Sequence, residues 1–279
     1  QAYLTPGQNK DGQQVGLPLR GHAYTLFYRK DVFDQLGLKT PETWADVEAA
    51  AKTIQEKTDL VGIAPYYGIT GGQNLFTWMA MLWSNGGDIF DANWKPTFNN
   101  EAGIAATQRY IDWVNTMKIA PEASKAFGES EGQTEYAQGR AAMWLGWSWY
   151  YANFSNAKLS APEVVKGTAF VPAPAWEGKG KPSTYGYIWQ TGIFKDSKNK
   201  DAAWEYMKWM LNPQTEKWVI MDKSDPKRDN VVGTHYSVLN DPEVNAKHNN
   251  LQKTIAEILQ DARALPMMPD WLQVQGLLE

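Results

Sequence analysis

Residues 13–57 read QQVGLPLRGHAYTLFYRKDVFDQLGLKTPETWADVEAAAKTIQEK, and this stretch predicts two strands followed by two helices. Apolar residues alternate up to Pro18, which is the pattern of a half-buried strand. The polar residues 20–22 then interrupt the pattern, and an apolar run from Thr25 to Tyr28 resumes it with aromatic residues that suit a pleated surface. We therefore expect a strand on each side of the interruption.

Two helices follow these strands. The first opens at Asp31 and can end at Gly37, because glycine has no Cβ to clash in the left-handed conformation. Thr43 caps the second helix, and Asp46 stands three residues later, where it can complete a capping box. The residues expected on the apolar stripe of this helix are Trp44, Val47, Ala51 and Ile54.

This order of elements resembles the family 1 extracellular solute-binding proteins of ABC importers, which include the maltose-binding protein and its sugar-binding relatives. The matching text is GLP, LFYRKDVFDQLGL and TPETWADVEAAAK. Four weaker matches follow in order: FTWMAMLWSNGGDIFD, QGRAAMWLGWSWY, FKDSKNKDAAWEYMKWMLNPQTEKW and LNDPEV. The resemblance implies an α/β, two-lobe periplasmic-binding-protein-like fold of type II, with a ligand cleft between lobes joined by hinge crossings.

The resemblance also implies where the lobes divide. The crossings are expected near residues 19–23, 183–189 and 239–242. Residues 1–19 and 189–240 would form a remnant of the first lobe, and residues 24–184 and 243–279 the second lobe. Compared with the family, much of the first lobe ahead of Gln1 and a closing helix after Glu279 are expected in a longer precursor with its own export signal.

Composition limits the function classes. A net charge of −4 and a pI near 5.5 argue against a nucleic-acid partner, which needs a concentrated basic face. The sequence holds no cysteine, so disulfides and thiolate chemistry are excluded, and its three histidines do not stand at metal-ligand spacing. We expect no cofactor and no metal. Fourteen tryptophans are far more than a core of this size needs, which suggests that a few stack on sugar rings.

The candidate ligand residues follow from the resemblance and from where aromatic and polar groups gather. Arg20 and His22 stand at the first crossing, although Arg20 could instead be paired on the surface. Gln73 and Asn74 lie on a loop before a helix. Of Trp147 and Trp149, we expect one to be buried and the other to line the cleft. The remaining aromatic candidates are Tyr185, Tyr187, Trp189 and Trp271.

These features favour a binding protein over an enzyme, with no catalytic residue assigned. A glycoside hydrolase is the alternative, and it would need two carboxylates roughly 5 to 9.5 Å apart. The aromatic stretches GWSWYY and YGYIWQ contain no carboxylate, although Glu177 and Asp270 lie nearby in sequence. An adhesion or scaffold protein would expose apolar patches instead.

The expected protein is a periplasmic or extracellular monomer that binds a small carbohydrate, and the expected ligand is an oligosaccharide. It would deliver this ligand to the membrane-embedded ABC permease of its transporter. A lipid anchor on the full-length precursor is a further alternative.

Overall fold

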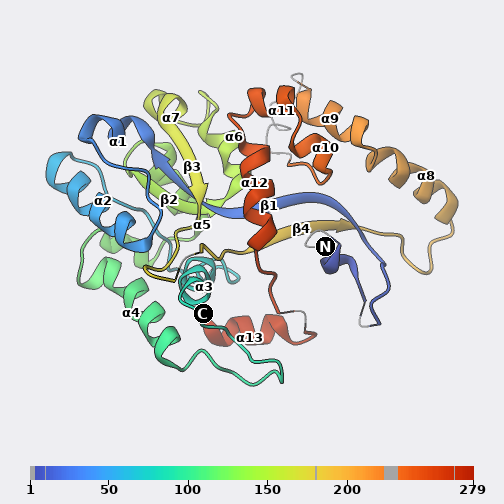
Figure 1. Ribbon diagram of the computed structural model, residues 1–279, viewed down its shortest axis with the longest axis horizontal. Helices are drawn as coiled ribbons and strands as arrows, with labels where there is room; N and C mark the ends of the chain where they lie inside the picture. The colour runs from blue at the N-terminus through green and yellow to red at the C-terminus, as the bar shows by residue number, and fades with distance from the viewer. Residues whose placement is uncertain (1–3, 10, 180, 223–231, 267) are drawn as a thin grey trace. The chain divides into compact units, whose positions relative to one another are not determined.

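The computed structural model describes residues 4–9, 11–179, 181–222, 232–266 and 268–279 (Figure 1). The chain forms two compact units, each built from segments that are distant in sequence. Unit 1 contains Gln1–Ala23, Ser148–Ala152 and Gly186–Ala264, and unit 2 contains Tyr24–Trp147, Asn153–Tyr185 and Leu265–Glu279. Residues 148–152 and 243–264 thus group with unit 1, whereas the sequence placed them in the second lobe. The lobe boundaries of the whole protein stay a prediction.

Strand β1 (Leu17–Arg29) contributes to both units, its first half to unit 1 and its second half to unit 2. The prediction of two strands separated by a polar interruption was wrong, because β1 runs through residues 20–22 without a break. Successive side chains of a strand point to opposite faces. Arg20 and His22 can therefore lie on one face while the backbone continues its hydrogen bonds.

In unit 2, the second half of β1 lies between β2 (Met143–Trp147) and β3 (Thr168–Pro172), and both neighbours are antiparallel to it. Around this sheet the chain forms η2 (Glu122–Lys125) and the helices α1 (Lys30–Leu36), α2 (Trp44–Lys57), α3 (Leu75–Ser84), α4 (Glu101–Asn115), α5 (Glu129–Ala137), α7 (Pro162–Gly167) and α13 (Trp271–Leu278). The short helices η3 (Ser148–Tyr150) and α6 (Tyr151–Phe154) follow β2. Large fully buried side chains of this core include Trp44, Trp113, Trp144, Tyr136 and Phe27.

The predicted start of α2 and end of α1 are confirmed. Gly37 ends α1 with a φ of 66°, in the left-handed region. The side chain of Thr43 accepts a hydrogen bond from the Asp46 backbone, and Asp46 bonds back to the backbone of Thr43. All residues of the expected apolar stripe of α2 are buried.

Two predictions in unit 2 were wrong. The sequence predicted that Ile104, Ile111 and Val114 of α4 face inward. Val114 is buried, but Ile104 and Ile111 are exposed, and the helix buries Tyr110 and Trp113 instead. The aromatic side chains remove more apolar area from water, and their polar atoms find partners, because Tyr110 donates to a backbone carbonyl and Trp113 to Glu48. Residues 128–133 were predicted to form a solvated loop, yet α5 begins at Glu129, with acidic residues at its positive end.

In unit 1, the first half of β1 pairs with the antiparallel strand β4 (Gly186–Thr191). The helical elements of this unit are η1 (Thr5–Gly7), α8 (Lys200–Met210), α9 (Pro213–Met221), α10 (Tyr236–Leu239), α11 (Pro242–Lys247) and α12 (Leu251–Asp261). The last four pack against one another (Figure 1). The predicted inward face of α12 is confirmed, because Leu251, Ile255, Ile258 and Leu259 are buried.

The sequence predicted that α8 turns an apolar face inward, and this prediction is largely wrong. The residues expected on that face are Ala202, Met207, Met210 and Leu211. Met207 is buried, but Ala202 is exposed, and Met210 and Leu211 are only partly buried. The exposed face of this helix carries several aromatic side chains, which hydrophobic periodicity would have turned inward. The charged loop predicted at residues 223–230 lies outside the described residues.

Candidate functional site

One face of the β1–β4 ribbon in unit 1 combines polar and aromatic side chains. In the antiparallel register Arg20 stands opposite Trp189, and His22 stands opposite Tyr187. Directly opposed residues have their side chains on the same face, so the alternation along both strands gathers these four side chains. The rings of Tyr187 and Trp189 contact each other edge-on, with centroids 5.2 Å apart.

A fifth candidate, Trp149, reaches this face from η3. Its ring meets the His22 ring edge-on, with centroids 4.9 Å apart at 86°. The hydroxyl of the preceding residue, Ser148, accepts a hydrogen bond of 3.2 Å from the backbone amide of Ala23. This bond ties the segment that follows β2 to the end of the ribbon and thereby positions Trp149.

These side chains surround a cavity of about 300 Å³ within unit 1. The residues that line it are Leu19, Arg20, His22, Trp149 and Trp189. Trp189 leaves half of its surface exposed, so an indole face is available to a bound molecule. Sequence reasoning missed Leu19, because an aliphatic residue in an alternating strand is ordinarily assigned to the core.

His22 is neutral near pH 7 in this environment. Burial lowers its pKa to about 3, and the positive charge of Arg20 acts in the same direction. The Nδ1 atom of His22 is buried and has no hydrogen-bond partner among the described residues. A neutral imidazole has one nitrogen that donates and one that accepts, so the ring can bind a hydroxyl group in either sense.

Arg20 is exposed and forms no ion pair with any residue that the structure describes. Its guanidinium offers five N–H donors. The structure therefore gives no support to the alternative of a surface ion pair, and it leaves these donors available at the edge of the cavity.

The other candidate residues lie in unit 2, where three of them pack together. Trp147 donates from Nε1 to the Gln73 side-chain oxygen at 3.1 Å. Tyr185 stacks in parallel on Phe76 with centroids 4.9 Å apart and meets the Trp147 ring at 5.2 Å. Only 3% of each of Trp147 and Tyr185 is exposed. The predicted burial of one tryptophan of the GWSW stretch is confirmed, because Trp147 is buried, whereas Trp149 lines a cavity in unit 1. The ligand role of the candidate residues in both units stays a prediction.

Asn74 and Trp271 complete the candidate set in unit 2. Each has one buried side-chain atom without a hydrogen-bond partner among the described residues, Oδ1 of Asn74 and Nε1 of Trp271. The backbone carbonyl of Asn74 accepts a hydrogen bond of 2.8 Å from Tyr110. The candidates therefore fall into two groups, one in each unit.

A sequence profile described as "Bacterial extracellular solute-binding protein" matches residues 2–217. The chain belongs to this family. It is a family of binding proteins and not of enzymes.

Curated proteins similar to this chain are also named as binding proteins. A putative binding protein of Brucella abortus is 25% identical over 288 residues, which cover 99% of this chain and 64% of the relative. The mannitol-binding protein of Pseudomonas aeruginosa is 30% identical over 207 residues, which cover 73% of this chain and 46% of that protein. The chain thus spans less than two thirds of the length of these curated relatives.

Solved structures confirm the fold. The maltose-bound MalE3 protein of T. maritima superposes with a TM-score of 0.83 at 20% identity, covering 99% of this chain and 68% of that one. A solute-binding protein of Agrobacterium radiobacter in complex with ribitol gives 0.80 at 24% identity, covering 99% and 67%. The mixed α/β periplasmic-binding-protein fold predicted from the sequence is thus confirmed.

Glu177, one of the two carboxylates that a glycoside hydrolase could use, forms an ion pair and does not line the cavity beside His22. Glu177 lies in unit 2, where Arg109 binds it at 2.9 Å. Burial acts to raise the pKa of Glu177, but the hydrogen bonds from Arg109 hold that pKa below its ordinary value. Of the residues that the structure describes, no carboxylate lines the cavity beside His22. Among the described residues, no group of three or more histidine, aspartate or glutamate side chains could hold a metal ion.

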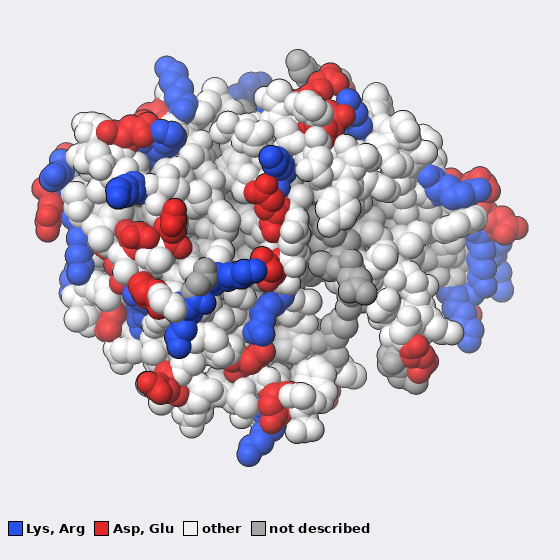
Figure 2. Space-filling model, viewed as in Figure 1, with Lys and Arg blue, Asp and Glu red and all other residues white. Residues whose placement is uncertain are grey.

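The visible surface carries mixed charge. On the face shown in Figure 2, lysine and arginine are interspersed with aspartate and glutamate, without an extended basic field. Within the described part of the chain, every helix is too short or too polar to cross a bilayer.

Proposed function

We propose that this chain is the ligand-binding part of the extracytoplasmic component of an ABC transporter, and that it binds a sugar or a polyol. The observation that carries the proposal is the cavity of about 300 Å³ in unit 1, where two indoles meet a neutral histidine and an arginine that forms no ion pair with a described residue. Ligand sites of this kind combine apolar walls with a few polar groups that fix orientation.

Each group has a distinct role toward such a ligand. Trp149 and Trp189 offer apolar surfaces to the CH groups of a sugar ring or polyol chain. Trp149 contacts the His22 ring and Trp189 stands opposite Arg20, so hydrogen-bond donors and acceptors lie beside both indoles. His22 can donate to one hydroxyl and accept from another, and Arg20 can donate several hydrogen bonds. Because none of the described residues that line this cavity is a carboxylate, they offer a cationic ligand no counter-charge.

The finer choice of ligand is between an oligosaccharide and a polyol. The number of tryptophans gives limited support for a ligand with several sugar rings, because seven of the fourteen are buried in the structure. The mannitol-binding protein of Pseudomonas aeruginosa and the Agrobacterium radiobacter protein in complex with ribitol support a polyol. The maltose-bound T. maritima protein supports a sugar chain. We keep the oligosaccharide as the first candidate and the polyol as the second.

The remaining parts of the proposal follow from the family. The protein would work in the periplasm or outside the cell, as a monomer, and would hand its ligand to the membrane-embedded permease. No chemical change of the ligand is part of this role, and no cofactor is required.

A titration of tryptophan fluorescence against mannitol, ribitol, maltose and maltotriose tests the proposal. We expect a saturable change with at least one of them, about tenfold weaker binding in Trp149→Ala, and unchanged binding in Trp94→Ala, an exposed tryptophan of unit 2. Mass spectrometry should recover the ligand intact. Consumption of the sugar would mean a hydrolase, and no response to any of the four would refute a carbohydrate ligand.

A further inference from the structure

The cavity beside His22 is lined by a single ionised side chain among the described residues. Three of its lining residues carry no ionisable group, and the buried His22 is neutral near pH 7. Only Arg20 is charged there, because a guanidinium is always protonated in proteins. Neutral donors and acceptors are enough to hold the hydroxyl groups of a sugar or a polyol. The one positive charge therefore needs an explanation of its own.

The charge of Arg20 acts inside the cavity and not only on the surrounding water. Arg20 and His22 are two positions apart on β1, so their side chains leave the same face of the strand. Trp189 stands opposite Arg20 on β4. Burial is the main cause of the low pKa of His22, about 3, and the positive charge of Arg20 lowers that pKa further. A molecule bound beside the His22 ring would experience the same positive field.

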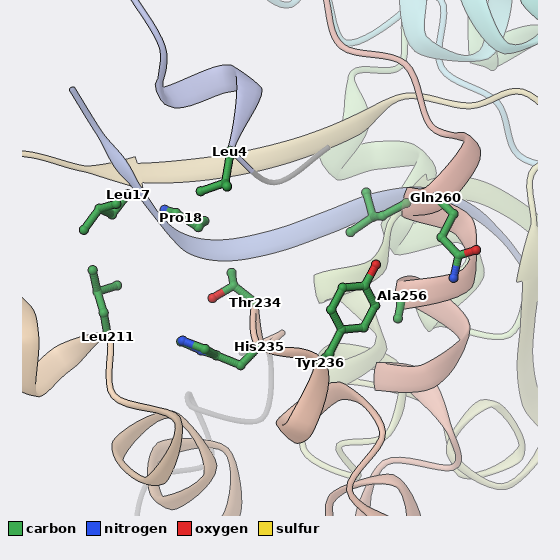
Figure 3. A pocket seen from close by; sticks show the side chains of 10 residues that line it. Leu4, Leu17, Pro18, Leu211, Thr234, His235, Tyr236, Ala256 and Gln260 are labelled. Carbon is green, nitrogen blue, oxygen red and sulfur yellow. The ribbon is translucent and has the colours of Figure 1, made fainter. Parts of the chain in front are cut away.

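A second cavity of unit 1 contains the carboxylate that could have neutralised this charge. Its volume is about 280 Å³, and it adjoins the first cavity, because Leu19 and Arg20 line both. Glu216 of α9 also lines it and is only 8% exposed. The partners of Glu216 are Thr234 and His235, which lie side by side on the segment before α10 (Figure 3).

These bonds use the full capacity of the Glu216 carboxylate. Its Oε1 accepts hydrogen bonds from the backbone amide and the hydroxyl of Thr234. Its Oε2 accepts from the backbone amide of His235 and from Nδ1 of the same residue, at 2.8 Å. A carboxylate has about four acceptor positions, and all of them are used here. Within the described part of the chain, Glu216 is therefore committed elsewhere, and Arg20 keeps an uncompensated charge.

We infer that the ligand of the cavity beside His22 carries one carboxylate group, as a uronic acid residue of a sugar or an aldonic acid does. The inference rests on the proposed function and narrows its ligand class. Arg20 binds the carboxylate through two parallel N–H donors, which is the geometry in which the two groups match. The indoles hold the CH groups, and His22 binds a hydroxyl. A phosphate group carries nearly two charges, so a single arginine suits a carboxylate better.

Matched pairs of ligands isolate the contribution of the carboxylate. Mannonate and mannitol, glucuronate and glucose, and maltobionate and maltitol each differ only by a carboxylate in place of a CH₂OH group. Calorimetry at pH 7 measures both members of each pair. In at least one pair we expect the acid to bind about tenfold more tightly than its neutral partner, or better, because charge-assisted hydrogen bonds are the stronger ones.

Three variants assign the preference to Arg20. In Arg20→Gln the ratio of the two affinities should fall to about one. Arg20→Lys keeps the charge but loses the planar fork, so an intermediate ratio is expected. Lys198→Gln is the matched control, because it removes the same charge from an exposed position of unit 1 that does not line the cavity. The ratio should be unchanged there, and melting curves check that all three variants fold.

The outcomes separate this inference from the proposed function. Equal binding of acid and neutral partner, or a preference that survives in Arg20→Gln, would overturn the inference and leave the proposed function standing. Equal loss of the preference in Lys198→Gln would also overturn it, because general surface charge would then be the cause. Tighter binding of glucose 6-phosphate than of glucuronate would assign the cavity to a phosphate instead. If no member of any pair bound, the proposed function and the inference would both fall.

Discussion

Replacing Arg109 by methionine should destabilise unit 2 by about 3 kcal/mol. Arg109 donates to Glu48 from Nε and Nη2, at 2.8 and 3.2 Å, and to Glu177 from Nη1 and Nη2, both at 2.9 Å. Its guanidinium also lies over the Trp176 ring, 4.3 Å from the centroid. These contacts tie α2 and α4 to the segment that follows β3.

The magnitude follows from what the substitution leaves behind. Removing one partner of a buried ion pair costs about 3 to 5 kcal/mol, because the other charge stays buried without compensation. Only 12% of the Glu48 side chain is exposed, but 35% of the Glu177 side chain reaches water and can be solvated. Trp113 still donates to Glu48 at 3.0 Å after the substitution. The expected loss of stability is therefore at the lower end of this range, about 3 kcal/mol.

Thermal and urea unfolding measure the effect. A loss of ~3 kcal/mol corresponds to a melting temperature lower by about 6 to 12 °C for a unit of this size. The matched control is Arg140→Met, whose ion pair with Glu135 lies at the surface, so its loss should cost less than about 1 kcal/mol. Equal effects of the two substitutions would refute the assignment of a buried, structurally important cluster.

The same cluster has a signature in pH. The folded-state pKa of Glu177 is depressed, so the stability it contributes is present above its ordinary value and is lost as pH falls through the lower folded-state value. Arg109→Met should therefore flatten the dependence of stability on pH below about 4.3, the unperturbed pKa of glutamate.

Three further predictions concern single residues. Trp149→Ala should weaken carbohydrate binding about tenfold, as measured by calorimetry, because it removes an aromatic wall worth ~1.4 kcal/mol of contact. The free energy of unfolding should fall by about 1.4 kcal/mol between pH 7 and pH 5.5, because His22 is protonated in the unfolded chain but stays neutral in the folded protein. An equal fall in His22→Gln would contradict this. Gly103→Ala should lower the melting temperature because its Cβ would lie 1.7 Å from the Phe98 carbonyl oxygen, whereas Gly276→Ala, with open space around it, should not.

The sequence predicted local structure well where a single physical signal decides it. The capping box at Thr43 and the left-handed Gly37 depend on residues within a few positions of each other. Alternation at a strand end predicted that one of Trp147 and Trp149 is buried, but only the structure shows that it is Trp147. In α4 two stripes competed, and only the three-dimensional partners Tyr66 and Glu48 show why the aromatic stripe is buried.

The candidate site itself could be predicted only in part. Arg20, His22, Tyr187 and Trp189 were recognisable as polar and aromatic groups at expected crossings, but their grouping depends on the register of β1 against β4. That register joins residues far apart in sequence, and no local pattern encodes it. The exposed aromatics of α8 are a second case, since periodicity assumes that every apolar side chain has something to pack against within the chain.

The path of β1 has a consequence for the order in which the protein is made. The strands that pair with its second half, β2 and β3, end at Pro172, so they leave the ribosome before β4 does. The first half of β1 cannot pair until β4, which begins at Gly186, has been synthesised. Until then, the edges of this half of β1 are available to other chains. During synthesis, Leu17 to Ala23 is therefore a segment exposed to aggregation, and a chaperone would find its binding site there.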